Sequence, residues 1–485
     1  MIATSGIAPS PGLIGGRPPG PFRIRGINVC ESLSRHRPGQ VQRLLDRLVQ
    51  WRMNTLVVHP QYGYREHSPV IREFCRDNGI DLVQYLYSFL AFTPNAAPGV
   101  FAVARGGHPH FQSVQCETRL CATNPDARRE FREGVRRYLN EGVEPGDHLL
   151  LATADGLLLC ECEGCRTLDA VGQWQPFLEI AVEEILRCGK PVTTHFLAYI
   201  GRFRPPDDMG IFQHIDAVMF DTHLRHRWLP LGVRHKLGPV ERVADRHDPE
   251  ARNKPVNIYL LEKLTEWRNR YQGRLYVFEN LMIQSCFSLP QPNTAALLQD
   301  QQTFRDLRID GVVYEAFEPG IGAFEEQLEH LSRGLMGDHE GYRPSELETI
   351  CSSLEGPENV RKRVLEYLFA PECQPRERLA LFLGRNESVE LAVQIRDYLT
   401  APDLPKLRQL VGLALAHRDE WDWFYIVYRL ATYLPAEQRP PNPTPAQARL
   451  FATPKPWDFL EAGNDPQEAM LALAQSLAQE DHLNR

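Results

Sequence analysis

The chain has 485 residues and a formal net charge of −8, with 43% hydrophobic and 24% charged residues. This composition is typical of a globular protein, and the acidic balance gives no electrostatic reason to expect a nucleic acid or an anionic membrane as partner. No apolar run approaches the roughly 18 residues that a membrane span requires. The length allows two or three domains, although one α/β barrel takes about 250 residues or more.

The N-terminal stretch, residues 1–21, is rich in Gly, Pro and Ser. It lacks the basic start and apolar core of a secretory signal, so we interpret it as a flexible lead-in. The cysteines number eleven, an odd count, and are scattered through expected helices and strands. Such usage favours buried thiols over a disulfide framework, and we therefore expect a cytoplasmic protein.

From Phe22 onward, eight short apolar or β-branched runs alternate with stretches of helical period. The expected strands are Arg23–Val29, Thr55–Val58, Asp81–Tyr87, His148–Ala152, Val192–Leu197, Ala217–Phe220, Leu275–Phe278 and Gly311–Tyr314. Expected helices between them cover residues 40–52, 68–78, a span starting at 124–125, and 176–188. Eight strands separated by helices predict a (β/α)₈ TIM-type barrel over residues 22–340. An open doubly wound sheet is the alternative, but no Gly-rich phosphate-binding fingerprint follows the first strand.

Strand signals end near Leu335, and residues 341–485 show helical periodicity instead. Apolar residues recur at helical spacing in three sets, one of which contains Leu407, Leu410 and Val411. A Pro-rich break at 439–445 precedes a last amphipathic stretch near 466–478. We therefore expect a C-terminal α-helical domain after the barrel.

An acidic residue ends or follows four of the expected strands, the fourth, sixth, seventh and eighth. These residues are Asp155, Asp221, Glu279 and Glu315. The C-terminal strand ends of a (β/α)₈ barrel form the mouth where active sites are built, so we expect the four to converge as catalytic carboxylates. Carboxylates held together can divide acid and base roles through their environments. The alternative is that each caps a helix or pairs with an arginine.

Histidine and aromatic residues gather after the same strands. They are His59, Tyr62 and Tyr64 after the second strand, His195 and Tyr199 at the fifth, and His223 and Trp228 after Asp221. Sugar rings present apolar C–H faces between hydroxyl groups, so this mixture of aromatic and polar side chains favours carbohydrate binding. Each residue taken alone is more often a structural hydrogen-bonding group.

Cys160, Cys162 and Cys165 form a C-x-C-x-x-C cluster just after the fourth strand. With Cys121 they would supply the four thiolates that a structural zinc ion prefers, and Cys116 is a spare ligand. We expect the four to converge, because the two segments leave the same end of neighbouring strands. The alternative is a set of buried, redox-inert thiols. No His–Glu pair at ligand spacing accompanies them, so we expect no metal or other cofactor for the chemistry.

Three motifs stand out together: Leu120–Pro125 (LCATNP), Asp155-Gly156 and Cys160–Cys165 (CECEGC). In this combination the chain resembles the bacterial domain-of-unknown-function family 4838, which is similar to the α-glucuronidases and β-N-acetylhexosaminidases. The likeness extends to Gly311–Glu315 and Leu328–Leu335 and covers about residues 22–340. The resemblance implies a barrel of the glycoside hydrolase kind.

By the arrangement in the α-glucuronidases, the resemblance implies Asp155 as the acid and Asp221 with Glu279 as base and orienting group. Glu315 becomes the acid if Asp155 instead holds sugar hydroxyls. Ala154 stands where the family usually has Asn and the hexosaminidases have a paired acid. This departure argues against a substrate-assisted mechanism through an acetamido group.

We therefore predict a glycoside hydrolase that cleaves a small glycoside or oligosaccharide with a carboxylate acid/base pair at the barrel mouth. A non-catalytic carbohydrate-binding barrel would keep the aromatic mouth but would need no matched acid pair. A sugar lyase or isomerase is a third class, and it would need a base such as His195 or Tyr199.

Overall fold

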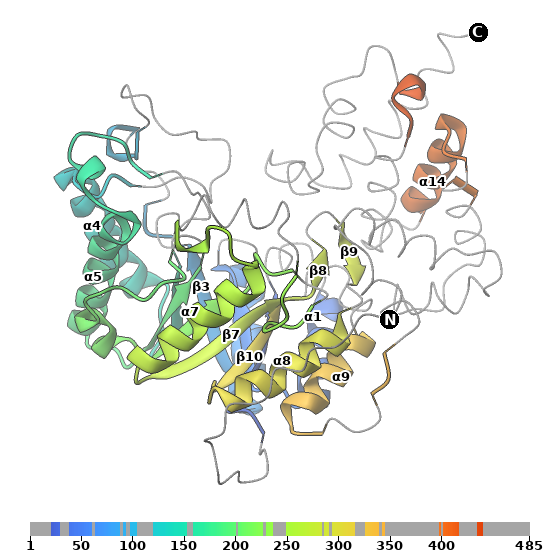
Figure 1. Cartoon of the computed structure of the whole chain (residues 1–485), viewed down its shortest axis with the longest axis horizontal. Helices are drawn as coiled ribbons and strands as arrows, with labels where there is room; N and C mark the ends of the chain where they lie inside the picture. The colour runs from blue at the N-terminus through green and yellow to red at the C-terminus, as the bar shows by residue number, and fades with distance from the viewer. Residues whose placement is uncertain are drawn as a thin grey trace.

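The computed structural model describes residues 21–29, 38–60, 64–87, 91–93, 98–103, 120–152, 159–199, 202–226, 229–235, 249–283, 286–290, 293–315, 325–338, 342–344, 397–398, 401–416 and 434–439. Within these residues, parallel strands close into a barrel in the order β1-β10-β7-β6-β5-β4-β3-β2 (Figure 1). Their bounds are β1 Ile24–Val29, β2 Thr55–Val58, β3 Asp81–Tyr87, β4 His148–Ala152, β5 Thr193–Ala198, β6 Ala217–Asp221, β7 Arg274–Asn280 and β10 Gly311–Glu315. The closed barrel of eight parallel strands confirms the expected fold class.

Helices surround this barrel, and most of them follow a strand of the barrel in the chain (Figure 1). Their bounds are α1 Pro38–Gln50, α2 Arg65–Asp77, α4 Pro125–Glu141, α5 Ala170–Cys188, α7 Val256–Arg270, α8 Thr294–Asp306 and α9 Glu325–Leu335. Helix α4 packs along α5, and α8 packs along α9. None of the helices that the structure describes is long and apolar enough to cross a membrane.

Shorter elements complete the connections. The 3₁₀ helices are η3 Pro98–Val100, η5 Cys165–Thr167, η6 Gly210–His214 and η7 Pro249–Ala251. A two-stranded antiparallel hairpin, β8 Met282–Ile283 with β9 Cys286–Pro290, follows β7 directly.

Aromatic side chains fill the layer between the sheet and the helices. Phe196 of β5 stacks on Trp174 of α5, with ring centroids 5.0 Å apart. The same ring meets Phe212 of η6 at 5.2 Å and Trp267 of α7 at 6.2 Å. All four residues are buried. The strands read as continuous apolar runs because side chains of one parity pack against helices while those of the other parity fill the barrel.

Three helices begin earlier than the sequence predicts, and α1 starts at Pro38 instead of residue 40. Helix α2 starts at Arg65 instead of residue 68, and it tolerates Pro69 because the Ser68 hydroxyl donates a hydrogen bond to the Arg65 carbonyl at 3.0 Å. Helix α5 starts at Ala170 instead of Pro176, because the Asp169 carboxylate caps it by accepting from Gly172 N at 2.8 Å. Both α2 and α5 therefore contain a proline inside the helix, Pro69 and Pro176.

The C-terminal region is described at residues 397–398, 401–416 and 434–439. Helix α14, Leu404–Ala416, carries the expected apolar set Leu407, Leu410 and Val411, and all three are buried. A 3₁₀ turn, η9 Ala436–Gln438, follows. The other expected apolar sets, the last amphipathic stretch and the lead-in up to residue 20 lie outside the described residues.

Two helical glycines provide a test of the packing around α4. A Cβ atom built on Gly134 of α4 would lie 1.7 Å from the Phe92 carbonyl oxygen, whereas one built on Gly412 of α14 would meet nothing within 4 Å. We expect Gly134→Ala to lower the free energy of unfolding by about 1–3 kcal/mol, because backbone must move to accept it. Gly412→Ala is the matched control and should be neutral or stabilising by up to about 1 kcal/mol. Denaturant unfolding measures both, and a neutral Gly134→Ala would contradict the packing.

Candidate active site and cysteine cluster

The strand register decides which side chains face the barrel interior. Asn28, Glu315 and Asn280 are aligned on the neighbouring strands β1, β10 and β7, so they point to the same side of the sheet. The Tyr276 hydroxyl of β7 lies 2.9 Å from His195 Nδ1 of β5, and these strands are separated by β6. This contact is made inside the barrel. Because Tyr276 and Asn280 are four residues apart on one strand, the aligned trio also faces the interior.

Glu315 is held between two asparagine amides at the C-terminal end of the barrel. Asn28 Nδ2 donates to Glu315 Oε1 at 3.3 Å, and Asn280 Nδ2 donates to Glu315 Oε2 at 2.6 Å. All three residues are buried, with at most 7% of their surface exposed. Asn28 Oδ1 in turn lies 3.2 Å from His59 Nε2, just after β2. The network therefore links the C-terminal ends of four neighbouring strands.

An aromatic wall continues this network toward β3. The ring of His59 stacks on Tyr85 with centroids 4.2 Å apart and an interplanar angle of 14°, and it meets Tyr87 at 5.8 Å. Burial lowers the pKa of His59 to about 3, so the imidazole is neutral at ordinary pH. The neutral imidazole and the two tyrosine rings form an uncharged cluster, in which Tyr87 is tilted by 54° to His59.

Asp221, His223 and Tyr199 form a second group at the mouth. Asp221 is aligned with Phe278, two residues before Asn280, so its buried side chain also belongs to the interior set. Its carboxylate accepts a hydrogen bond from the His223 backbone N–H. The His223 ring meets Tyr199 edge to face at 5.8 Å. The structure thus brings together three residues that the sequence predicts for the site.

Glu279 faces the helices, which corrects the expectation that all four carboxylates converge at the mouth. It is aligned with Tyr314, whose hydroxyl accepts a hydrogen bond from Gln301 of α8 at 2.8 Å. Glu279 Oε1 accepts from Arg225 Nη1 at 2.6 Å, and Arg225 Nη2 donates to Asp300 of α8 at 2.5 Å. Successive side chains of a strand point to opposite faces, so the residue before Asn280 lies behind the sheet.

The three charges of this group are buried together. Burial raises the pKa of Glu279 and of Asp300, against the opposing effect of the Arg225 guanidinium. Burial also disfavours the charged form of Arg225, but the two carboxylates outweigh it and raise its pKa. The ion group joins the segment after β6 to β7 and α8, and its role is structural.

Tyr64 also lies behind the sheet and away from the mouth. The Arg72 guanidinium of α2 lies 5.9 Å from the centre of its ring, and Arg72 pairs with Asp147, which directly precedes β4. Gln84 of β3, aligned outward, donates to the same Asp147 carboxylate at 2.7 Å. Tyr64 is therefore part of the packing between α2 and the sheet, and its expected place in the sugar site is wrong.

His195 faces the interior but lies deep below the mouth. It is four residues before Tyr199, about 13 Å lower along β5. His195 Nε2 lies 3.1 Å from His148 Nδ1, and His148 Nε2 lies 3.7 Å from Asp81 at the start of β3. Together with the Tyr276 contact, these bonds form a polar chain that leads to the N-terminal end of the barrel. His195 therefore does not share the mouth with Tyr199.

Other expected site residues lie outside the described part of the chain. These are Asp155, Tyr62, Trp228 and the spare ligand Cys116. Conversely, sequence reasoning missed Asn28, Asn280, Tyr85 and Tyr87. A signal for two of them exists, because Asn28 interrupts an apolar strand and Asn280 has the parity of Tyr276. Only the alignment of neighbouring strands tells which parity faces inward.

A polar cavity of about 860 Å³ lies at the opposite, N-terminal end of the barrel. Its lining includes Arg23, Arg268 and Asp310, and the Asp310 carboxylate pairs with both arginines at 3.7 and 3.4 Å. Asp310 also accepts from Leu275 N at 2.9 Å. The contacts of Asp310 therefore stabilise the N-terminal end of the barrel, opposite the mouth.

The interior histidines make the stability of the fold depend on pH. Burial lowers the pKa of His148 and places that of His195 well below its ordinary value. Such histidines bind protons only after unfolding, so the folded state should lose stability as pH falls below about 6.5. We expect each of these two histidines to contribute a slope of up to about 1.4 kcal/mol per pH unit between pH 6.5 and the folded-state pKa.

Urea unfolding at a series of pH values between 8 and 5 measures this slope. His195→Gln should flatten the acidic part of the curve, because one proton uptake on unfolding is removed. His214→Gln removes an exposed histidine and is the matched control, expected to reproduce the wild-type curve. Equal slopes for wild type and His195→Gln would show that the polar chain does not resist protonation.

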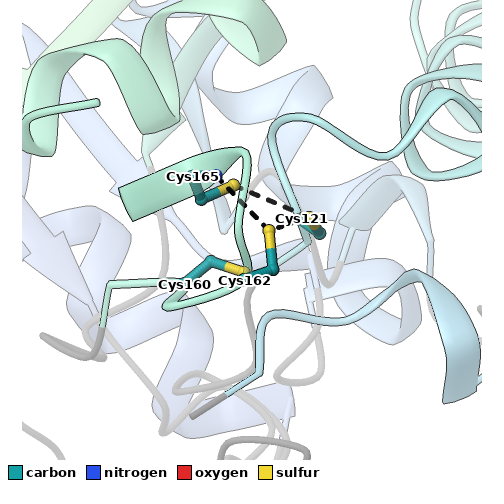
Figure 2. Close-up of side chains that lie close together, drawn as sticks. All are labelled: Cys121, Cys160, Cys162 and Cys165. Atoms are coloured by element: carbon teal, nitrogen blue, oxygen red, sulfur yellow. Dashed lines mark hydrogen bonds between the residues drawn. The ribbon is translucent and has the colours of Figure 1, made fainter. Parts of the chain in front are cut away.

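The structure brings Cys121, Cys160, Cys162 and Cys165 together, as expected. Their four Sγ atoms all lie within 4.8 Å of one another (Figure 2). Cys121 Sγ is 3.6 Å from both Cys162 Sγ and Cys165 Sγ, too far for a disulfide bond. Sulfurs about 2.3 Å from a central zinc ion would form a tetrahedron with edges of about 3.8 Å. The two separations of 3.6 Å from Cys121 Sγ are close to that edge length.

Backbone and side-chain groups around the cluster direct hydrogen bonds at the sulfurs. Val103 N donates to Cys160 Sγ and Cys165 N to Cys162 Sγ, each at 3.4 Å. The Thr123 hydroxyl lies 3.4 Å from Cys162 Sγ and 3.3 Å from Cys165 Sγ. Burial disfavours the thiolate of Cys162, but these hydrogen bonds outweigh it and lower its pKa to about 6.

Hydrogen bonds to neighbouring residues hold both of the segments that carry the cysteines. Cys121 N donates to Val100 O at 2.9 Å, next to the bridge between Phe101 and Leu120. The Gln173 side chain of α5 accepts from Cys160 N at 2.7 Å and donates to Cys160 O and Cys165 O, each at 3.1 Å. The cluster therefore joins the segment before α4 to the segment between β4 and α5.

No family model matches the chain, and no curated protein matches its sequence. Among solved structures, it is similar to an endo-1,4-β-mannanase from Rhizomucor miehei, with 11% identity over 67% of this chain and 95% of that one and a TM-score of 0.40. A β-galactosidase from Rahnella sp. R3 matches at 13% identity over 73% and 66%, with a TM-score of 0.44. A chitobiase from Flavobacterium johnsoniae matches at 11% identity over 95% and 78%, with a TM-score of 0.43. Values this low carry no argument about activity.

Proposed function

We propose that the protein is a glycoside hydrolase whose active site is the C-terminal mouth of the barrel. One observation carries the proposal: Asp221 and Glu315 are buried carboxylates of the inward-facing set, on strands separated only by β7. Burying a carboxylate costs free energy, and buried ionisable groups are concentrated at functional sites. The resemblance to family 4838 points to the same class and stays part of the proposal.

Glycoside hydrolysis needs one carboxyl group to protonate the leaving oxygen and a second to activate water or attack the anomeric carbon. Asp155, which follows β4 in the sequence, would be the acid, as the resemblance implies. Asp221 would be the base, held in position by the His223 backbone N–H. We assign no catalytic role to Glu279, because its carboxylate accepts a hydrogen bond from Arg225 on the helix side of the sheet.

The substrate we propose is a small glycoside or oligosaccharide. The stacked His59 and Tyr85 rings, with Tyr87 beside them, offer an apolar face for a sugar ring. The half-buried His223 offers a polar edge for hydroxyl groups on the opposite side of the mouth. A cytoplasmic location, proposed from the cysteine usage, would fit short substrates that have been imported.

The other two classes make different demands on the site. A lyase or isomerase that used His195 as its base is disfavoured, because both ring nitrogens of His195 are engaged deep in the barrel. Tyr199 is left as the base for that class. A non-catalytic sugar-binding barrel would bind carbohydrate without hydrolysing it.

A panel of aryl glycosides and uronosides tests the proposal. We expect at least one to be cleaved, and Asp221→Asn and Asp155→Asn each to lower kcat roughly 10²–10⁴-fold, because each removes a proton-transfer group. Asp126→Asn, on the exposed first turn of α4, is the matched control and should retain wild-type turnover. Near-normal turnover of both site variants would refute the assignment, and sugar binding without any hydrolysis would favour the non-catalytic barrel.

We also propose that the four-cysteine cluster holds a structural zinc ion. Thiolates this close repel one another unless a cation or protons neutralise them, and a closed Cys₄ set is a common structural zinc site. The metal would tie the segment before α4 to the segment after β4. It would take no part in the chemistry, since all four ligand positions are filled by protein.

Elemental analysis of protein purified without chelators tests the metal. We expect about one zinc ion per chain in the wild type and none in Cys162→Ser. The melting temperature of Cys162→Ser should also be lower, because the metal no longer links the two segments. Cys188→Ser, at the end of α5 and away from the cluster, is the matched control and should keep the metal. A folded wild-type protein with no bound metal and four freely titrating thiols in the cluster would end this proposal.

A further inference from the structure

Both oxygens of the Glu315 carboxylate accept a hydrogen bond from an asparagine side chain. Oε1 accepts from Asn28 Nδ2 at 3.3 Å and Oε2 accepts from Asn280 Nδ2 at 2.6 Å. The three residues lie at one level on three adjacent strands, so the register itself places an amide on each side of the carboxylate. Strands of the barrel wall are rigid, and this geometry is therefore fixed before any substrate arrives.

The orientation of the Asn28 amide is set from its other side. Its Oδ1 lies 3.2 Å from His59 Nε2, and His59 is held by stacking on Tyr85. A neutral imidazole with its proton on Nε2 donates to Oδ1, which directs the Asn28 NH₂ group at Glu315. Reversing the amide would place two N–H donors against the imidazole donor and a carbonyl against the carboxylate.

Amide nitrogens of this kind donate hydrogen bonds and do not accept them. Protonation would make the Glu315 oxygens weaker acceptors and would therefore weaken the two bonds from Asn28 and Asn280. Hydrogen bonds to the charged form of a carboxyl group favour that form, and Glu315 receives one on each oxygen. An acid that must deliver a proton to a leaving group needs the opposite environment.

We infer that Asn28 and Asn280 are positioning residues that keep Glu315 ionised and aimed into the mouth, where it is a second anionic group in addition to the proposed base Asp221. In this role the carboxylate stabilises the positive charge that develops on the sugar ring as the glycosidic bond breaks. The inference rests on the proposed glycosidase function for that role, and it excludes Glu315 as the substitute acid. The ionised state itself is independent of whether any glycoside is cleaved.

Carbon-13 NMR of protein labelled at the glutamate carboxyl carbons tests the inference without using activity. The Glu315 resonance is assigned by its absence in Glu315→Gln. In the wild type it should keep the shift of the ionised form to the lowest pH at which the protein stays folded. Asn280→Leu removes the 2.6 Å bond to Glu315. In this variant the resonance should move toward the protonated position at a pH about one unit higher than in the wild type.

Asn28→Ala removes the longer bond and should have the same effect to a smaller degree, which keeps the test open if Asn280→Leu fails to fold. Asn54→Leu, at the opposite end of the barrel, also removes side-chain hydrogen bonds, to Arg23 O and Arg25 N, and should leave the Glu315 resonance unchanged. A Glu315 titration that is the same in the wild type, Asn280→Leu and Asn28→Ala would overturn the inference.

The same variants separate this inference from the function. Where a cleaved glycoside is found, Asn280→Leu should shift the acidic limb of the pH profile of kcat/KM to higher pH, together with the midpoint of the NMR titration. Asn54→Leu should shift neither. A shifted resonance with no hydrolysis of any glycoside would uphold the positioning role and overturn the function. Hydrolysis of a glycoside with an unshifted Glu315 resonance would uphold the function and overturn the positioning role.

Discussion

The site depends on the parallel register of a closed barrel. Once β1 pairs with β10 and β10 pairs with β7, every residue of these strands is assigned either to the interior or to the helix layer. A shift by one residue would exchange the two sets completely. Asn28, Glu315 and Asn280 therefore belong to one surface as a consequence of backbone hydrogen bonding, and their amide–carboxylate contacts follow from that alignment.

The same constraint separates two kinds of buried charge. Glu315 lies inside, where its two carboxylate oxygens accept hydrogen bonds from the side-chain amides of Asn28 and Asn280. Glu279 is in register with Tyr314 and lies outside, where Arg225 and Asp300 enclose it in a buried ion group. Removing one member of such a group is strongly unfavourable, so it serves to fix the segment after β6 against α8. Neighbouring strand ends thus carry carboxylates with different purposes.

Much of the fold could be predicted from the sequence, because buried parallel strands are continuous apolar runs and their number defines the barrel. The cysteine cluster was also predictable, since the two segments leave adjacent strand ends. The facing of Glu279 and Tyr64 was not, because a strand buried on both sides shows no alternation of polar and apolar residues. The depth of His195 was not predictable for a related reason. How far a residue lies below the mouth depends on the contacts it makes across the barrel, which its distance from the end of the strand in the sequence does not reveal. Asn28 and Asn280 acquire meaning only through their alignment with Glu315.

The most direct test of this account compares two glutamates that lie at neighbouring strand ends but face opposite ways. On any glycoside that the protein cleaves, Glu315→Gln should lower kcat/KM by roughly 10²-fold or more, because it removes a charge that faces the substrate. Glu279→Gln should leave kcat/KM close to that of the wild type while lowering the melting temperature, since its partners are Arg225 and the helix layer. An equal loss of activity in both variants, or a larger loss in Glu279→Gln, would contradict the assignment of the barrel interior as the active site.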